Sequence, residues 1–196
     1  MVRTVRAALW SAASNGSQIV LNLLGVVLLA RWIGPEAYGL FGSAAVVIGL
    51  LHMLSGAALT ASITQREHIE PGHVDATFWL LLGLAVPLAA GAWLMAPELT
   101  TWLGAPDAAD VLRVLCWCVP MGALSAVPMA LLARDLRFGE LARISMSSAV
   151  AANLVGITAA GCGAGLWSLV AMEFTREVFA LIGGFALSGW RPGVRG

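Results

Sequence analysis

The chain has 196 residues, of which 59% are hydrophobic and only 11% are charged, whereas about 25% are charged in an ordinary soluble domain. Its mean hydropathy is +0.86, and its formal net charge of zero gives no basic patch for nucleic acid. We therefore expect a single membrane domain over residues 1–196, with no room left for a separate soluble domain that binds nucleotide or does chemistry.

Six stretches of roughly twenty uncharged, mostly apolar residues follow one another, each long enough to cross a hydrocarbon core about 30 Å thick. Because a lipid-embedded backbone must satisfy its own hydrogen bonds, and these runs are too long for barrel strands, they predict an all-α fold, a polytopic bundle of six membrane helices. The first stretch resembles a signal peptide but is too long and lacks a clear cleavage site, so we expect it to be retained. The predicted helices cover residues 7–30, 40–62, 78–96, 111–133, 144–162 and 166–187.

All eleven basic residues are arginines, and basic residues in short loops stay on the cytoplasmic side. With the N-terminus inside, the inside segments hold eight arginines and the outside segments hold only Arg31 and Arg113. Both termini are therefore predicted to be cytoplasmic. Between the fourth and fifth helices, Arg134, Arg137 and Arg143 lie beside apolar residues, which is typical of a segment that contacts lipid headgroups or that simply anchors the topology.

Glycine and proline residues mark the turns between these stretches and the breaks within them. Gly34 and Pro35 form a turn that starts the second helix, and residues 161–165 (Gly-Cys-Gly-Ala-Gly) are short enough to require an antiparallel hairpin. Pro120 and Pro128 interrupt the fourth predicted helix and Pro87 interrupts the third, because each removes an internal hydrogen bond.

The first predicted helix carries a stripe of polar side chains. They recur at spacings of three, four and seven, which places them on one helical face that is unsuited to lipid tails. Two interpretations stay open, hydrogen bonds between helices and a water-filled cavity that binds substrate. The stripe consists of Ser11, Ser14, Asn15, Gln18 and Asn22.

The sixth predicted helix contains Glu173, Arg176 and Glu177, the only formal charges well inside a predicted span. Glu173 and Arg176 are spaced i, i+3 and can neutralise each other, so the cluster is either self-compensated or a cavity-facing site for a cation, a proton or a polar headgroup. His52, within the second predicted helix, is either structural or part of a proton path.

The sequence contains no Ser/His/Asp arrangement, no Cys/His metal spacing and no phosphate-binding glycine loop. We expect no enzymatic activity, no cofactor and no metal. Cys116, Cys118 and Cys162 lie in apolar stretches, where a thiol usually packs as a small hydrophobic group.

Four motifs resemble a known family and occur in its order. Residues 31–39 (Arg-Trp-Ile-Gly-Pro-Glu-Ala-Tyr-Gly) are similar to the Arg-x-Leu-Gly-Pro-Glu-x-Tyr-Gly signature of Wzx-like polysaccharide flippases, in the multidrug/oligosaccharidyl-lipid/polysaccharide (MOP) exporter superfamily. Residues 62–66 (Ser-Ile-Thr-Gln-Arg) followed by residues 77–80 (Thr-Phe-Trp-Leu) resemble its connection between helices two and three. Residues 134–138 resemble its Arg-Asp-Leu-Arg-Phe loop, and residues 161–170 its turn into helix six.

The resemblance implies translocation of an undecaprenyl-diphosphate-linked oligosaccharide across the bacterial inner membrane by alternating access between two six-helix lobes. The family has no invariant set of site residues to carry over, so position and chemistry select the candidate contacts for the headgroup or the sugar. These are Arg31, Asn15, Gln18 and Asn22, with Glu173, Arg176 and Glu177 as further candidates. The sequence stops after the sixth helix, where the family continues with a second lobe. We therefore expect a homodimer, a separate C-terminal lobe, or a truncated product.

Two other functions fit the same residues. A cation-coupled drug or organic-cation antiporter of the same superfamily would use Glu173 or Glu177 for proton or sodium coupling. A non-transporting membrane partner of a glycan assembly complex would tolerate substitutions along the polar stripe of the first helix.

Overall fold

The computed structural model of the protein describes residues 25, 29–65 and 71–193. This part of the chain is helical and contains no strand, which confirms the predicted all-α class. Within these described ranges, four helical stretches are long and apolar enough to cross a membrane: Pro35–Ser55, Gly72–Leu94, Pro106–Arg134 and Phe138–Gly161.

The helices overlap five of the six predicted ranges, and the first range, 7–30, lies almost wholly outside the described residues. Residues 29–33 form a helical turn that ends at Gly34, whose φ of +87° suits glycine. The elements that follow are α2 (Pro35–Gln65), α3 (Pro71–Leu94), α4 (Ala96–Trp102), η1 (Pro106–Ala108), α5 (Ala109–Leu115), α6 (Cys118–Arg134), α7 (Phe138–Gly161) and α8 (Trp167–Ser188).

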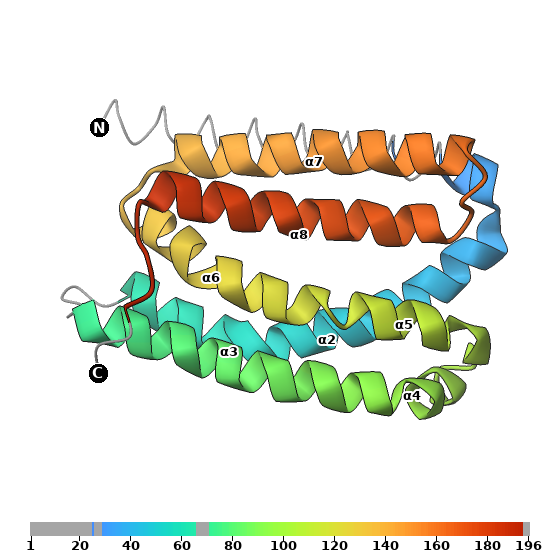
Figure 1. The fold of residues 1–196 in the computed structure, drawn as a ribbon, viewed down its shortest axis with the longest axis horizontal. Helices are drawn as coiled ribbons and strands as arrows, with labels where there is room; N and C mark the ends of the chain where they lie inside the picture. The colour runs from blue at the N-terminus through green and yellow to red at the C-terminus, as the bar shows by residue number, and fades with distance from the viewer. Residues whose placement is uncertain (1–24, 26–28, 66–70, 194–196) are drawn as a thin grey trace.

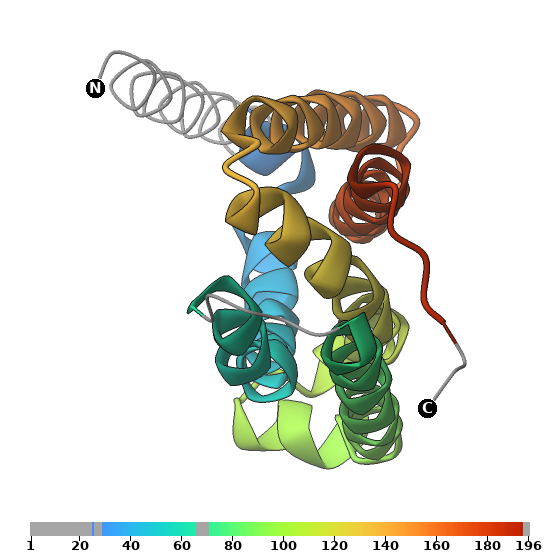
Figure 2. The same ribbon diagram turned by 90° about the vertical axis from the view of Figure 1, so that its left-hand side faces the viewer.

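Two antiparallel helix pairs form the sides of the bundle (Figure 1). Helices α7 and α8 lie along each other, α2 and α3 form the second pair, and α6 runs between them and packs on α8, α2 and α3. The end view in Figure 2 shows α6 between the two pairs. The turn between α7 and α8 makes the predicted hairpin, with positive φ at Gly163 and Gly165.

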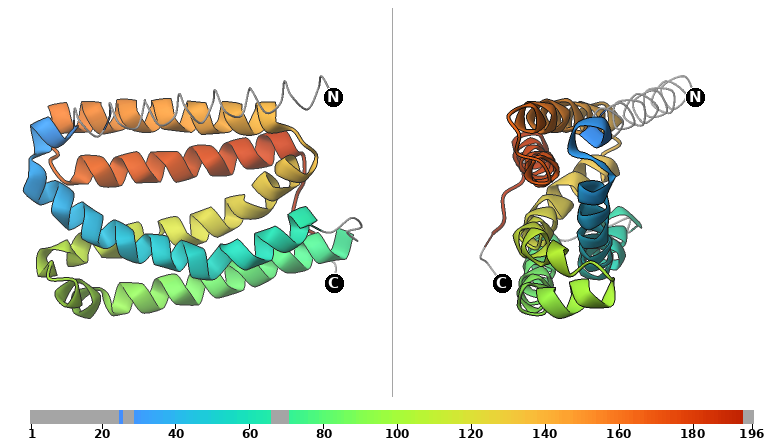
Figure 3. Two further views of the ribbon diagram at one scale, coloured as in Figure 1. Left: turned by 180° about the vertical axis from the view of Figure 1, so that it is seen from behind. Right: turned by 90° about the vertical axis from the view of Figure 1, so that its right-hand side faces the viewer.

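The connections alternate between the two ends of the bundle, as Figure 3 shows from behind. One end carries the Gly34 turn, α4 with η1, and the turn between α7 and α8. The opposite end carries the connection between α6 and α7 and the segment that follows α8. By their places in these elements, Arg134, Arg137 and Arg191 lie at this second end. Among the described residues, arginines are therefore more frequent at the end that the predicted orientation places in the cytoplasm.

The main core lies between α2, α3, α5 and α6, where Leu81, Leu112 and Val119 are fully buried. The outer face of α2 is also apolar, with Val46, Leu50 and other side chains well over half exposed. So large an exposed apolar surface is unusual on a soluble monomer and suits contact with lipid tails. Helix α8 is long enough to cross a membrane, but its three charged residues lie near its middle, whereas the four stretches above carry their charges toward their ends.

Two consecutive glycines bring α8 close to both of its neighbours. A Cβ atom at Gly183 would lie 2.8 Å from Cγ1 of Ile144 on α7, and one at Gly184 would lie 3.3 Å from Cβ of Pro128 on α6. Small residues at helix contacts allow backbones to approach closely in membranes. This approach fixes how α8 is placed beside α6 and α7.

The fourth predicted helix is broken into two pieces. Helix α5 ends at Leu115 and α6 begins at Cys118, because Pro120 has no N–H to donate to the Cys116 carbonyl. That carbonyl instead accepts from the N–H of Val119, at 3.2 Å. The interruption predicted at Pro120 is thus present, and it changes the direction of the chain beside α3. The interruptions predicted at Pro128 and Pro87 are absent, since α6 and α3 continue through these residues.

Candidate polar cavity

A cavity of about 590 Å³ lies between α2, α6, α7 and α8. Its wall combines small apolar residues with hydroxyl, imidazole, guanidinium and carboxylate groups, inside helices that are otherwise strongly apolar. Met53 in this wall is 71% exposed, so the cavity opens to the surface beside α2. The lining residues with polar side chains are His52, Ser55, Ser125, Ser145, Ser148, Arg176 and Glu177.

His52 on α2 and Glu177 on α8 approach each other across Gly122 on α6. A Cβ atom at Gly122 would lie 3.1 Å from Nε2 of His52 and 3.6 Å from Oε2 of Glu177. The same His52 Nε2 lies 3.3 Å from the Cys118 carbonyl oxygen, to which it donates in the Nε2–H tautomer. Glycine at this position therefore leaves the space in which two ionisable groups from different helices meet.

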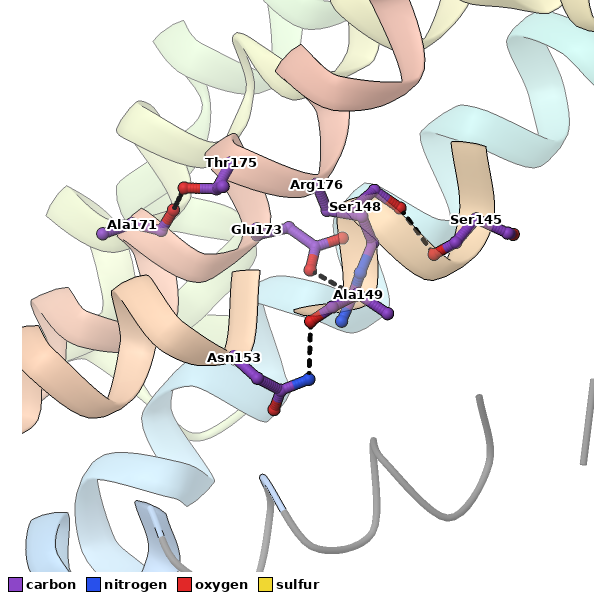
Figure 4. A network of polar contacts seen from close by, with 8 residues as sticks. All are labelled: Ser145, Ser148, Ala149, Asn153, Ala171, Glu173, Thr175 and Arg176. Atoms are coloured by element: carbon purple, nitrogen blue, oxygen red, sulfur yellow. Dashed lines mark hydrogen bonds and ion pairs between the residues drawn. The ribbon is translucent and has the colours of Figure 1, made fainter. Parts of the chain in front are cut away.

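The charges on α8 are only partly compensated (Figure 4). Nη1 of Arg176 lies 2.8 Å from Oε2 of Glu173, one helical turn earlier, as the i, i+3 spacing predicts. Glu177 has no ion-pair partner among the residues that the structure describes. Two carboxylates and one guanidinium give this stretch of α8, beside the cavity, a net negative formal charge, which disfavours an anion and favours a cation or a hydroxyl donor.

Serine hydroxyls line the remaining wall and donate to backbone carbonyls of their own helices. Ser125 donates to Gly122 at 3.0 Å, Ser148 to Ser145 at 2.9 Å and Ser55 to His52 at 3.3 Å. A hydroxyl oxygen has two acceptor lone pairs beyond its one proton. These oxygens therefore can accept hydrogen bonds from a polyhydroxylated molecule in the cavity.

The structure brings together some of the predicted site residues and separates others. Arg176 and Glu177 line the cavity, and Glu173 supports it through Arg176. Arg31 is exposed in the helical turn before Gly34 and does not line the cavity. The rest of the predicted substrate contacts lie outside the described residues: Asn15, Gln18 and Asn22.

The predicted headgroup arginines lie where α6 ends and α7 begins. Arg137 pairs with Glu140, with Nη2 and Oε2 2.6 Å apart, and Arg143 is exposed on α7. Between Arg134 and Arg137, Leu136 is 69% exposed and has a φ of +55°, a conformation that costs a non-glycine residue about 1–2 kcal/mol. An exposed leucine among arginines is chemically suited to a membrane surface, but the contact with lipid stays a prediction.

Sequence reasoning missed the cavity serines on α6 and α7 and the role of Gly122. The available signal was the spacing of small polar residues inside apolar stretches. Gly122 and Ser125 are three residues apart, as are Ser145 and Ser148, which places each pair on one helical face. His52 was recognised, but its position opposite Glu177 depends on contacts between helices.

The amino-acid sequence is similar to those of known proteins. Residues 28–196 match the model of a family described as "Polysaccharide biosynthesis protein". The chain is 34% identical over 183 residues to the "Succinoglycan biosynthesis transport protein ExoT" of Rhizobium meliloti (strain 1021), which covers 93% of this chain and 37% of that protein. No solved structure matches it.

A second relative is the "Uncharacterized membrane protein in cps region" of Klebsiella pneumoniae. It is 27% identical over 154 residues, covering 75% of this chain and 30% of that protein. The chain thus spans about a third of the length of the curated relatives it matches. The family match covers most of the chain, including all the helices that form the polar cavity. The predicted resemblance is confirmed, and the chain belongs to the polysaccharide biosynthesis protein family of flippase-like membrane proteins.

Proposed function

We propose that this chain takes part in translocating an undecaprenyl-diphosphate-linked oligosaccharide across the bacterial inner membrane, and that the polar cavity is part of the path. The single observation that carries the proposal is a cavity of about 590 Å³ with hydroxyl and charged walls inside strongly apolar helices. Such groups are costly in a bilayer unless they face a partner or a water-filled space. The family match and the transport name of one relative support the same function.

The chemistry of the wall fits the sugar part of this substrate better than the diphosphate. Sugar hydroxyls donate to the oxygens of Ser125, Ser148 and Glu177, and they accept from Arg176. A diphosphate would be repelled by the net negative charge of α8. We therefore assign the oligosaccharide to this cavity and leave the diphosphate to cationic groups elsewhere in the complete transporter.

A second lobe would complete the path. The cavity opens beside Met53, and the match covers about a third of each relative. We propose two sources for this second lobe, another copy of the chain or a C-terminal lobe. Alternating access would then move the sugar between the leaflets as the two lobes rock against each other, as in transporters built from repeats.

Complementation of a bacterial strain that lacks its polysaccharide flippase tests the proposal. The chain would be expressed alone and together with a C-terminal lobe from a relative, and surface glycan would be measured at matched protein levels. Export by the chain alone supports a homodimer, and export only with the second lobe supports a split transporter. If neither arrangement restores export although the protein is in the membrane, the proposal is wrong.

A second candidate function is a cation-coupled drug or organic-cation antiporter. The observation that favours it is the carboxylate of Glu177 opposite His52, on a net negative stretch of α8 and without an ion-pair partner among the described residues. Efflux of an organic cation that stops when the ion gradient is collapsed, together with failed glycan complementation, would favour this function over the first.

A further inference from the structure

A second cavity, separate from the polar one, opens on the flank of the bundle between α3 and the α5–α6 junction. Its volume is about 470 Å³, and its wall is apolar apart from two indoles and a thiol. Trp93 and Trp117 in this wall are 44% and 64% exposed, so the cavity is a groove on the outer surface. The lining residues are Val86, Ala89, Ala90, Trp93, Leu94, Cys116, Trp117 and Pro120.

The sequence produces this groove through two local features. The break before Pro120 turns the chain at Cys116 and Trp117 and leaves a gap between the fourth span and α3. On the opposite wall, Ala89 and Ala90 are too small to fill that gap. A large side chain at either alanine would close the groove without touching the polar cavity, whose lining contains neither residue.

Arg113, a cationic residue, lies at one end of the groove, beside Trp93. The guanidinium of Arg113 lies 5.6 Å from the ring centroid of Trp93, and Nη1 is 3.1 Å from Oδ1 of Asp110, whose side chain is 80% exposed. Nε of Arg113 is buried and has no hydrogen-bond partner among the described residues. An ion pair this exposed is weak. The guanidinium of Arg113 can therefore bind another anion, such as a phosphate, beside Asp110 or in its place.

The groove matches one leaflet in length. Val86 and Leu94 are eight residues apart on α3, which corresponds to about 12 Å of helix. Half of a hydrocarbon core about 30 Å thick is of similar size. The groove therefore accommodates a chain that enters from one face of the membrane and stops near the midplane.

We propose that this groove is a binding site for an anionic phospholipid, with one acyl chain between α3 and the α5–α6 junction and the phosphate on Arg113. The apolar wall excludes water, so hydrocarbon fills it in a bilayer. The guanidinium supplies the charge complementarity, since arginine binds phosphate through several N–H donors. The predicted orientation places Arg113 outside, so the lipid belongs to the outer leaflet of the inner membrane.

Native mass spectrometry of the full chain tests this site. The protein would be extracted from nanodiscs of equal phosphatidylglycerol and phosphatidylethanolamine content, and the retained lipids would be identified. We expect phosphatidylglycerol to be retained at least threefold over phosphatidylethanolamine. Arg113→Gln should remove this preference, and Ala90→Trp should remove most bound lipid of both kinds.

Ala76→Trp is the matched control, because Ala76 is also exposed on α3 but does not line the groove. It should retain lipid as the unmodified chain does. Equal lipid retention by the Ala90→Trp and Ala76→Trp variants would overturn the site, as would a phosphatidylglycerol preference that survives Arg113→Gln. If Ala90→Trp folds poorly, Ala90→Leu gives the same comparison with a smaller side chain.

Discussion

His52 of α2 and Glu177 of α8 face each other across Gly122 of α6. A methyl group at Gly122 would lie 3.1 Å from Nε2 of His52 and 3.6 Å from Oε2 of Glu177. Three helices therefore meet at one point of the polar cavity. The two ionisable groups come from parts of the chain more than a hundred residues apart.

Gly122→Ala is expected to lower glycan export several-fold while the protein still inserts. The new methyl group moves the imidazole away from the Cys118 carbonyl and narrows the space beside Glu177. Gly91→Ala on α3 is the control, since a Cβ there meets open space and Gly to Ala within a helix usually adds about 0.5–1 kcal/mol of stability. Equal export by the two variants would contradict a role for this space.

Glu177→Gln and Glu173→Gln are expected to act differently, although both remove one carboxylate from α8. Glu177 has no ion-pair partner among the described residues. The Glu177→Gln variant should therefore reduce export and leave the protein level unchanged. Glu173→Gln leaves the half-buried Arg176 without its partner, a loss of about 1–3 kcal/mol, and should lower the amount of folded protein.

Immunoblotting of membranes beside the export assay separates these two effects. Arg176→Ala extends the comparison, because it leaves Glu173 unpaired and should lower the protein level in the same way. If Glu177→Gln lowers the protein level as much as Glu173→Gln does, all three charges form a structural cluster rather than part of a transport site.

Gly183→Ala is expected to destabilise the contact between α7 and α8. The added methyl group would lie 2.8 Å from Cγ1 of Ile144, and overpacking of this kind costs about 1–3 kcal/mol. Thermal unfolding in detergent measures the loss. Gly139→Ala on α7 serves as the control, because a Cβ there has no neighbour within 4 Å.

The double variant Gly183→Ala/Ile144→Ala tests the contact itself. Removing the isoleucine branches makes room for the new methyl group, so the double variant should be more stable than the sum of the single effects predicts. If the effects of the two single substitutions on stability simply add in the double variant, Ile144 does not limit how closely α8 approaches α7.

The predicted orientation can be checked with a native cysteine. Cys162 is exposed at the end of α7, whereas Cys116 and Cys118 are buried; the expectation that all three thiols pack as hydrophobic groups is therefore wrong for Cys162. With both termini cytoplasmic, Cys162 faces the periplasm, and a membrane-impermeant maleimide should label it in intact spheroplasts. Labelling that requires lysis would reverse the orientation. Cys162→Ser should abolish the signal in either case.

Local sequence determines where helices begin, break and end. Gly34 and Pro35 separate one helix from the next, Pro120 breaks the fourth predicted helix, and the turn before Trp167 forces an antiparallel hairpin. Each depends on the φ preference of glycine or the missing N–H of proline, which act within a few residues. The ion pair of Glu173 and Arg176 was equally predictable, because one helical turn brings them together.

The sequence by itself thus determined the all-α membrane class, the helix ranges that the structure describes and the family. Only the tertiary structure decided that His52 lies opposite Glu177, that serines of α6 and α7 share a wall, and that a groove opens beside α3. The physical reason is that α2 and α3 are apolar on all sides, so no polar stripe marks the face that turns inward. Their rotation is set by close contacts between helices, such as Gly122 of α6 against His52 of α2, which a pattern of hydropathy does not contain.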